Sequence, residues 1–281
     1  MPGIKIVVDS SADLPEEVVR ELDITIVPLN VTFGSKTFLD TELSPEEFWR
    51  LAEELEHPKT SLPPMGVFQQ AFERLVSRGY DVLCLTITGR HSGTFNSAKM
   101  AAQPFGDRVV VWDSLSLSWG LGWQAIRAAR MAREGATMEE ILQALHSLRE
   151  RSHILILLDT LEHLRRGGRA SQLFPIIDRI ARALHIKVLL SVEKGELKLF
   201  GAVRSFNKGM QRIVREVSRL GPLESLCVMH MRNPEAGEKL AQSLAQATGI
   251  PRERIPIGEA GAVLAVHGGK GLVAALAVVA P

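Results

Sequence analysis

Residues 4–15 read IKIVVDSSADLP, and this stretch decides the first half of the fold. An apolar run of strand length ends at Asp9, and hydroxyl side chains and a proline follow it. The pattern predicts a buried strand that leads into a helix capped by Asp13. Apolar runs at residues 82–88 and 109–112 are each followed by a helix-compatible stretch. Because these runs lack polar alternation, they predict a parallel sheet covered on both faces.

Further signals place elements between these strands. Residues 24–33 read as a strand interrupted at Pro28, and residues 65–78 carry apolar side chains at helical spacing. Ser44 followed by Pro45 is typical of the start of a helix. The alternation of strands and helices indicates a doubly wound α/β domain, which we place at residues 1–153.

The second half has a different pattern. The segment Glu193-Lys194-Gly195 lies between two apolar runs and predicts a β-hairpin. Two more apolar segments, residues 261–266 and 272–279, are too close in sequence for an intervening helix, which predicts antiparallel strand pairing. We therefore expect a C-terminal α+β domain with a mainly antiparallel sheet at residues 154–281.

Composition excludes several classes of function. Lys and Arg number 33 and Asp and Glu 32, so a net charge of +1 offers no basic surface for nucleic acid. No apolar run reaches the ~18 residues of a membrane span, so we expect no stable membrane insertion. The N-terminus enters a strand directly, without a secretory signal, and both Cys84 and Cys227 lie in apolar runs. These features predict a cytoplasmic protein with buried thiols.

No motif indicates a metal or a nucleotide cofactor. The histidines and cysteines form no cluster with metal-ligand spacing. Residues 120–125 spell a dinucleotide fingerprint, but residues 114–119 separate them from the preceding strand, so close helix packing is the better interpretation. The glycine-rich residues 267–271 lack the spacing of a Walker loop.

Three hydroxyl-rich segments, at residues 9–11, 59–64 and 88–94, lie where strands or helices should end. In a doubly wound sheet, ligands bind beyond the carboxyl ends of the strands, and we expect the three segments to meet at this one edge. Hydroxyl groups beside a helix start can hold an anion, although the same residues also serve as ordinary helix caps. The sequence therefore leaves both roles open for each segment.

Taken in order, these and other short blocks resemble the DegV family of bacterial fatty-acid-binding proteins. The resemblance runs from Val7 to the C-terminus. Its blocks are DSSADLP (9–15), KTS (59–61), SGTFNSA (92–98), DS (113–114), TLEHL (160–164), GGR (167–169), HIK (185–187), Arg204 and HGGKG (267–271).

The resemblance implies a two-domain fold in which an apolar tunnel, at or near the domain interface, holds a long-chain acyl tail. It implies that Thr60 and Ser92 contact the carboxylate of the acid. The neighbours expected to complete this carboxylate site are Ser61, Gly93 and Thr94. The residues expected at the site mouth, or in presentation of the acid, are Arg169, Arg204 and His267.

The implied function is binding of a long-chain fatty acid such as palmitate, stearate or oleate, without another cofactor and without enzymatic activity of its own. The acid would be presented to a separate fatty acid kinase, of which this chain would be the acyl-carrying subunit. A rival hypothesis is an acyl hydrolase with Ser92 as nucleophile and His267 as base, although Ser92 lacks a Gly-x-Ser-x-Gly elbow. A third hypothesis is a scaffold without a ligand, from which lipid extraction would recover nothing.

Overall fold

The structure, a computed structural model, describes residues 3–55, 57–168 and 186–281. The chain forms two compact units. Unit 1 comprises Met1–Glu150 and Gly261–Val263, and unit 2 comprises Arg151–Ala260 and Leu264–Pro281. Nothing in the sequence predicted the short second segment of unit 1. Within the described ranges, no helix combines the length and the apolar character that crossing a membrane requires.

Unit 1 is built on a four-stranded sheet with the order β2-β1-β6-β7. Every strand pair in it is parallel, as the continuous apolar runs predicted. The carboxyl ends of all four strands therefore lie at one edge of the sheet. The strands are β1 (Ile4–Asp9), β2 (Thr25–Val27), β6 (Asp81–Thr86) and β7 (Val109–Asp113).

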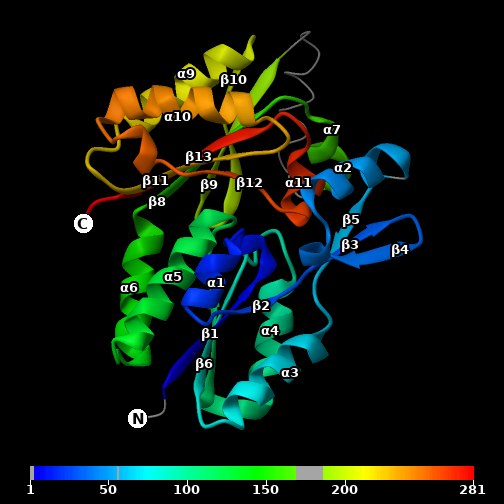
Figure 1. The fold of residues 1–281 in the computed structure, drawn as a ribbon, viewed down its shortest axis with the longest axis vertical. Coiled ribbons are helices and arrows are strands. Elements are labelled where there is room, and N and C mark those ends of the chain that lie inside the picture. The colour runs from blue at the N-terminus through cyan, green and yellow to red at the C-terminus, as the bar shows by residue number, and fades with distance from the viewer. Residues whose placement is uncertain (1–2, 56, 169–185) are drawn as a thin grey trace. The chain divides into compact units, whose positions relative to one another are not determined.

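Helices cover both faces of this sheet (Figure 1). On one face, α3 (Met65–Val76) and α4 (Thr94–Ala102) bury Phe68 and Phe72 against a cluster that includes Cys84. On the other face, α5 (Trp119–Arg133) packs against β1 and β6. This arrangement is the doubly wound architecture that the sequence predicted.

Two expectations about local structure in unit 1 have different outcomes. Ser44 is the N-cap of α2 (Pro45–Glu54), and its Oγ accepts a hydrogen bond from the amide of Glu47 at 3.2 Å, as predicted. The expectation that Asp13 caps the next helix is wrong. Asp13 has φ 52° and ends a short 3₁₀ helix, while the following helix, α1 (Glu16–Glu21), has Pro15 at its N-cap. The Asp13 carboxylate is used elsewhere, as described below.

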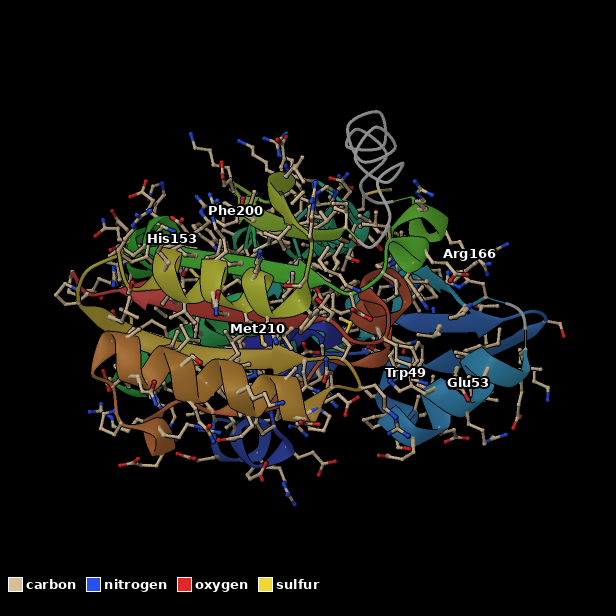
Figure 2. All side chains as sticks on the ribbon, turned by 90° about the horizontal axis from the view of Figure 1, so that it is seen from above. Trp49, Glu53, His153, Arg166, Phe200 and Met210 are labelled. Carbon is tan, nitrogen blue, oxygen red and sulfur yellow. The ribbon has the colours of Figure 1, made fainter. Side chains whose placement is uncertain are left out.

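A second sheet of unit 1 has three antiparallel strands in the order β4-β3-β5. Figure 2 shows two residues of α2, which follows β4: Trp49 is buried whereas Glu53 is exposed, so this helix is amphipathic. The remaining elements of unit 1 are β3 (Asn30–Phe33), β4 (Lys36–Leu39), β5 (Lys59–Ser61) and α6 (Met138–Glu150).

Unit 2 contains a six-stranded sheet with the order β10-β9-β8-β13-β11-β12. All its pairs are antiparallel except β11 with β12, in agreement with the predicted α+β character. The strands are β8 (Ser152–Leu158), β9 (Lys187–Glu193), β10 (Glu196–Val203), β11 (Leu223–His230), β12 (Ile257–Glu259) and β13 (Val273–Val279). Among the described residues, the α-helices that lie wholly within unit 2 are α7 (Glu162–Gly167), α9 (Phe206–Val217) and α10 (Pro234–Thr248).

The hairpin prediction is confirmed, and one strand prediction is wrong. Lys194 and Gly195, with φ of 49° and 82°, connect β9 to β10, as a two-residue hairpin turn requires. Residues 261–266, expected to form a strand, instead contribute to helix α11 (Ala262–Gly268), which continues from unit 1 into unit 2. A short apolar run fits a buried helix as well as a buried strand, and here its alanines favour the helix.

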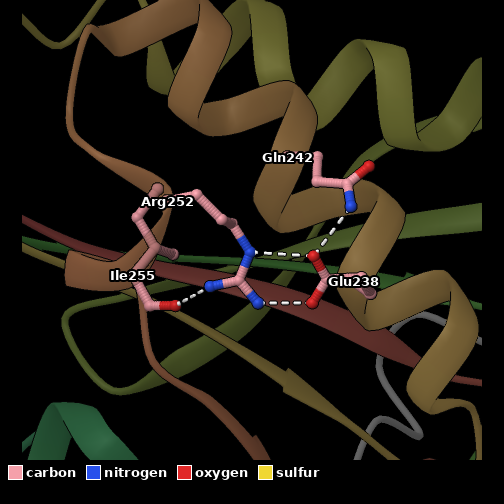
Figure 3. A network of polar contacts seen from close by, with 4 residues as sticks. All are labelled: Glu238, Gln242, Arg252 and Ile255. Atoms are coloured by element: carbon pink, nitrogen blue, oxygen red, sulfur yellow. Dashed lines mark hydrogen bonds and ion pairs between the residues drawn. The ribbon is translucent and has the colours of Figure 1, made fainter.

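A network of polar contacts connects α10 to the segment that follows it (Figure 3). The Arg252 guanidinium donates to both carboxylate oxygens of Glu238, at 3.0 and 2.5 Å, and to the carbonyl oxygen of Ile255 at 2.7 Å. Gln242 donates to the same carboxylate at 2.8 Å. The network fixes the chain between α10 and β12, and the guanidinium holds the pKa of Glu238 below its usual range.

Gly209 allows α9 to lie close to the sheet of unit 2. A Cβ atom at this position would lie 2.4 Å from Cδ1 of Leu157, a fully buried residue of β8. We expect Gly209→Ala to lower the free energy of unfolding by about 1–3 kcal/mol in urea denaturation, because overpacking exceeds the gain in helix propensity. The matched control is Gly66→Ala on α3, where a Cβ meets no atom within 4 Å. Equal stability of the two variants would contradict the packing argument.

Candidate ligand-binding site

Two of the three hydroxyl-rich segments lie at the carboxyl edge of the parallel sheet. Residues 9–11 begin at the last residue of β1, and residues 88–94 follow β6. The third does not end a strand of this sheet: Lys59–Ser61 is itself β5, which pairs with β3 in the antiparallel sheet. The expectation of three loops at one sheet edge is therefore corrected to two loops and a neighbouring strand.

The structure nevertheless brings the β5 segment and the start of α4 together within unit 1. A Cβ atom on Gly93 would lie 2.9 Å from Cδ2 of Leu62, the residue after β5. One turn into α4, the hydroxyl of Ser97 donates to the carbonyl oxygen of Pro63 at 3.3 Å. The blocks that contain Thr60 and Ser92 are therefore spatial neighbours, although they are far apart in sequence.

The loop that carries Ser92 is held by a continuous series of hydrogen bonds. The amides of residues 87–91 each donate to an acceptor. In order, these acceptors are the Asp9 carboxylate, the Ser116 carbonyl, the Asp113 carboxylate, and the hydroxyl and the carbonyl of Thr88. The next two amides, those of Ser92 and Gly93, donate to no acceptor among the described residues. The series therefore ends where the candidate site begins.

Ser92 and Thr94 form a compact pair of hydroxyl groups. Their oxygens lie 2.7 Å apart, and the Thr94 amide donates to Ser92 Oγ at 3.2 Å. Thr94 is buried at the first residue of α4, Ser92 and Thr60 are half-buried, and Gly93 and Ser61 are exposed. A helix start presents backbone N–H groups without helical acceptors, so hydroxyls and amides converge there as hydrogen-bond donors. This donor set suits an anionic group.

Three carboxylates shielded from water lie behind this edge of the sheet: Asp9 and Asp40 are buried residues, and Asp13 is half-buried. Burial raises the pKa of Asp9 to about 6, of Asp13 to about 7 and of Asp40 to about 6. Hydrogen bonds oppose the effect of burial: Asp13 accepts from the Ser118 hydroxyl at 2.5 Å and from the Gly261 amide at 3.0 Å. Sequence reasoning did not single out Asp13 or Asp40 for such a role, because nothing in the residue pattern shows that these carboxylates are shielded from water.

The residues expected at the site mouth belong to unit 2. Arg204 is exposed and directly precedes Ser205, the N-cap of α9. His267 is half-buried on α11, and its Nδ1 lies 2.4 Å from the point that a Cβ of Gly167 would occupy. The glycine of the GGR block thus lets α7 approach the imidazole closely. Arg169 lies outside the described residues.

Sequence reasoning gave no role to an ion pair in unit 2. Lys187 Nζ lies 2.6 Å from Asp159 Oδ1 and also donates to the Asp159 carbonyl at 2.9 Å. The pair joins the start of β9 to the end of β8. Lys187 belongs to the HIK block, which was the only signal that could have drawn attention to it.

The fold and the donor set define a class: an α/β protein of two units, in which hydroxyl groups and open backbone amides gather at a helix start. The chain belongs to the DegV family, since its residues 3–280 match the family described as "Uncharacterised protein, DegV family". A DegV domain-containing protein of Lactococcus lactis subsp. lactis is 32% identical over 270 residues, covering 95% of this chain and 96% of the relative.

Solved structures of the family are similar along the whole chain. The structure described as "Fatty Acid Binding of a DegV family Protein from Thermus thermophilus" has a TM-score of 0.90 at 30% identity and covers 99% of this chain and 100% of that one. A Thermotoga maritima protein, whose structure "reveals fatty acid binding function", has a TM-score of 0.83 at 28% identity with full coverage of both chains. The family resemblance and the fold class predicted from the sequence are both confirmed.

The raised pKa of Asp13 gives a testable dependence of stability on pH. The pKa of an Asp in the unfolded chain is ~3.9, whereas burial raises the pKa of Asp13 in the fold to about 7, so only the folded protein keeps this proton between those values. Its contribution to stability is therefore lost as the pH rises from about 4 to about 7. We expect Asp13→Asn, which resembles the protonated acid, to flatten the dependence of the unfolding free energy on pH. At pH 8 the unfolding free energy of the variant should exceed that of wild type by on the order of 2–4 kcal/mol.

Urea denaturation at several pH values measures this profile. The matched control is Asp107→Asn at an exposed position of unit 1, which should leave the profile as in wild type. A profile for Asp13→Asn that runs parallel to that of wild type between pH 5 and pH 8 would show that Asp13 does not keep its proton in the fold.

Proposed function

We propose that this protein binds long-chain fatty acids, with the carboxylate held by the hydroxyls of Thr60, Ser61 and Ser92 and by the backbone around Gly93 and Thr94. The observation that carries the proposal is the meeting of the β5 segment with the start of α4, where two amides lack acceptors among the described residues. The fatty-acid binding of the DegV proteins from Thermus thermophilus and Thermotoga maritima supports the choice of anion.

The energetics of a fatty acid fit such a donor set. Burial of a tail of ~14 methylenes contributes roughly 11 kcal/mol before the costs of association, so the tail supplies most of the affinity. A carboxylate buried without partners would cancel several kcal/mol of this gain. The hydroxyls and amides at the start of α4 prevent that loss and fix which end of the acid lies there.

The geometry around Ser92 supports binding rather than hydrolysis. A nucleophile elbow holds its serine in a strained turn, whereas Ser92 is not among the residues with positive φ. Its Oγ accepts from the Thr94 amide and pairs with the Thr94 hydroxyl. The hydrolase alternative therefore gains no support from the loop that would have to carry its nucleophile.

Lipid extraction followed by mass spectrometry should recover a long-chain fatty acid from freshly purified protein. After delipidation, Thr60→Ala and Ser92→Ala should each weaken binding of palmitate or oleate by about 10–100-fold, because each removes a hydrogen bond to a charged group. The control is Thr37→Ala on β4, an exposed threonine of the same antiparallel sheet as Thr60. Unchanged affinity in the Thr60→Ala, Ser92→Ala double variant would refute the carboxylate assignment.

We further propose that the bound acid is presented to a separate fatty acid kinase, with Arg204 and His267 acting in the transfer, and Arg169 with them. Phosphoryl transfer needs positive charge or donors near the acceptor oxygen, which an arginine supplies at any physiological pH. The family resemblance of these blocks supports the proposal. It makes this chain the acyl-carrying partner and leaves the chemistry to the kinase.

Alanine substitution of Arg204 or His267 should separate presentation from binding. We expect fatty-acid affinity to stay within a few-fold of wild type, because the tail provides most of the binding energy, while acyl-phosphate formation with a matching kinase falls strongly. A parallel loss of binding and phosphorylation would make both residues carboxylate ligands instead. No change in either quantity would end the presentation role for this protein.

A further inference from the structure

The loop after β6 is anchored by two carboxylates that belong to the strands on either side of it. We propose that Asp9 and Asp113 are positioning residues that hold this loop and so place the Ser92 hydroxyl and the Ser92 and Gly93 amides for the ligand. The effect of this anchoring on ligand binding rests on the proposed function. The anchoring itself can be tested without any ligand.

Asp9 is fully buried at the end of β1 and anchors the beginning of the loop. Its Oδ2 accepts from the Ile87 amide at 2.6 Å, and its Oδ1 accepts from the hydroxyl and the amide of Ser11, at 2.5 and 3.0 Å. None of the ion pairs formed by the described residues includes Asp9. A buried acid without a cation is costly, so its hydrogen bonds to the loop are what stabilise its charged form.

Asp113 anchors the loop two residues further on, from the end of β7. Both of its carboxylate oxygens accept from the Gly89 amide at 3.2 Å, and Oδ1 also accepts from Leu115 at 3.0 Å. The carboxylate lies so close that a Cβ on Gly89 would be 2.9 Å from Oδ2. Position 89 therefore needs glycine for this contact, although its own φ is not positive.

The two anchors fix a short and fully bonded path to Ser92. Between them the Thr88 amide donates to the Ser116 carbonyl at 2.9 Å. Beyond them the amides of Arg90 and His91 donate to the hydroxyl and the carbonyl of Thr88, at 3.2 and 3.4 Å. Apart from the bond to Ser116, each hydrogen bond on this path joins a residue of the loop to an anchor or to Thr88, so a change at either anchor can displace Ser92.

The charge state of Asp9 is the variable that can be changed in the intact protein. Burial raises its pKa to about 6, and the titratable groups that interact with it are Asp13, Asp40 and Cys84, none of which is a cation. When Asp9 takes up a proton, its oxygens accept less strongly from Ile87 and Ser11. The loop should therefore be held most firmly above about pH 6.

The first experiment follows backbone amides of the delipidated full chain by ¹H–¹⁵N NMR between pH 5 and pH 8. We expect the amides of Ile87, Ser92 and Gly93 to shift together with a midpoint near pH 6. The Gly135 amide, which donates to Ala132 in a turn of unit 1, should not follow that transition. An Ile87 transition without one at Ser92 and Gly93 would refute positioning, and no transition at Ile87 would remove Asp9 from the proposal.

The second experiment measures oleate affinity at pH 8. Asp113→Asn and Gly89→Ala should each weaken binding by about tenfold. The first variant removes an acceptor oxygen of the Asp113 carboxylate, and the second displaces that carboxylate with its new Cβ atom. Gly66→Ala is the matched glycine control and should bind as wild type does. Wild-type affinity in both loop variants would overturn the proposal and leave the proposed function intact. Absence of oleate binding by the wild type would overturn the proposed function, and the NMR titration would still decide the anchoring.

Discussion

The structure of unit 1 depends on the constraint that a buried carboxylate must be surrounded by hydrogen-bond donors. Asp9 ends the central strand β1 and is fully buried, so its donors have to come from nearby backbone and hydroxyl groups. One of these donors is the first amide of the loop after β6. Because parallel strands end at the same edge, Asp113 can hold the same loop from the other neighbouring strand. Two acids thus order the segment that the proposed ligand requires.

The two parts of a fatty acid place separate demands on its binder. Burial of the tail supplies affinity but does not discriminate between the two ends of the molecule, since the hydrophobic effect has no direction. In the proposed site, the hydroxyls and amides at the start of α4 would supply direction, because they are partners for an anion and not for an apolar group. Rigid anchoring of the loop then matters more than the number of donors, since a displaced donor loses most of its hydrogen bond.

Much of the architecture could be predicted because its signals are local. Continuous apolar runs indicated the parallel sheet, the Lys194-Gly195 turn indicated the hairpin, and Ser44 marked the start of a helix. The signals failed where two structures share one pattern. Residues 261–266 are apolar enough for a strand and form part of α11, and Asp13, which has the chemistry of an N-cap, adopts a left-handed conformation. In each case packing decided between conformations that local propensity leaves close in energy.

The sequence by itself determined the fold class and the family, because strand periodicity and the order of short blocks are properties of the chain alone. Through the family resemblance it also predicted the carboxylate ligands, and these stay a prediction. Only the tertiary structure decided that Leu62 meets Gly93, that the amides of Ser92 and Gly93 stay open among the described residues, and that Asp13 reaches Gly261. Such contacts join residues far apart in the chain, and the pKa of a buried acid depends on everything packed around it. Neither can be obtained from a local pattern, since each depends on the distances that folding creates.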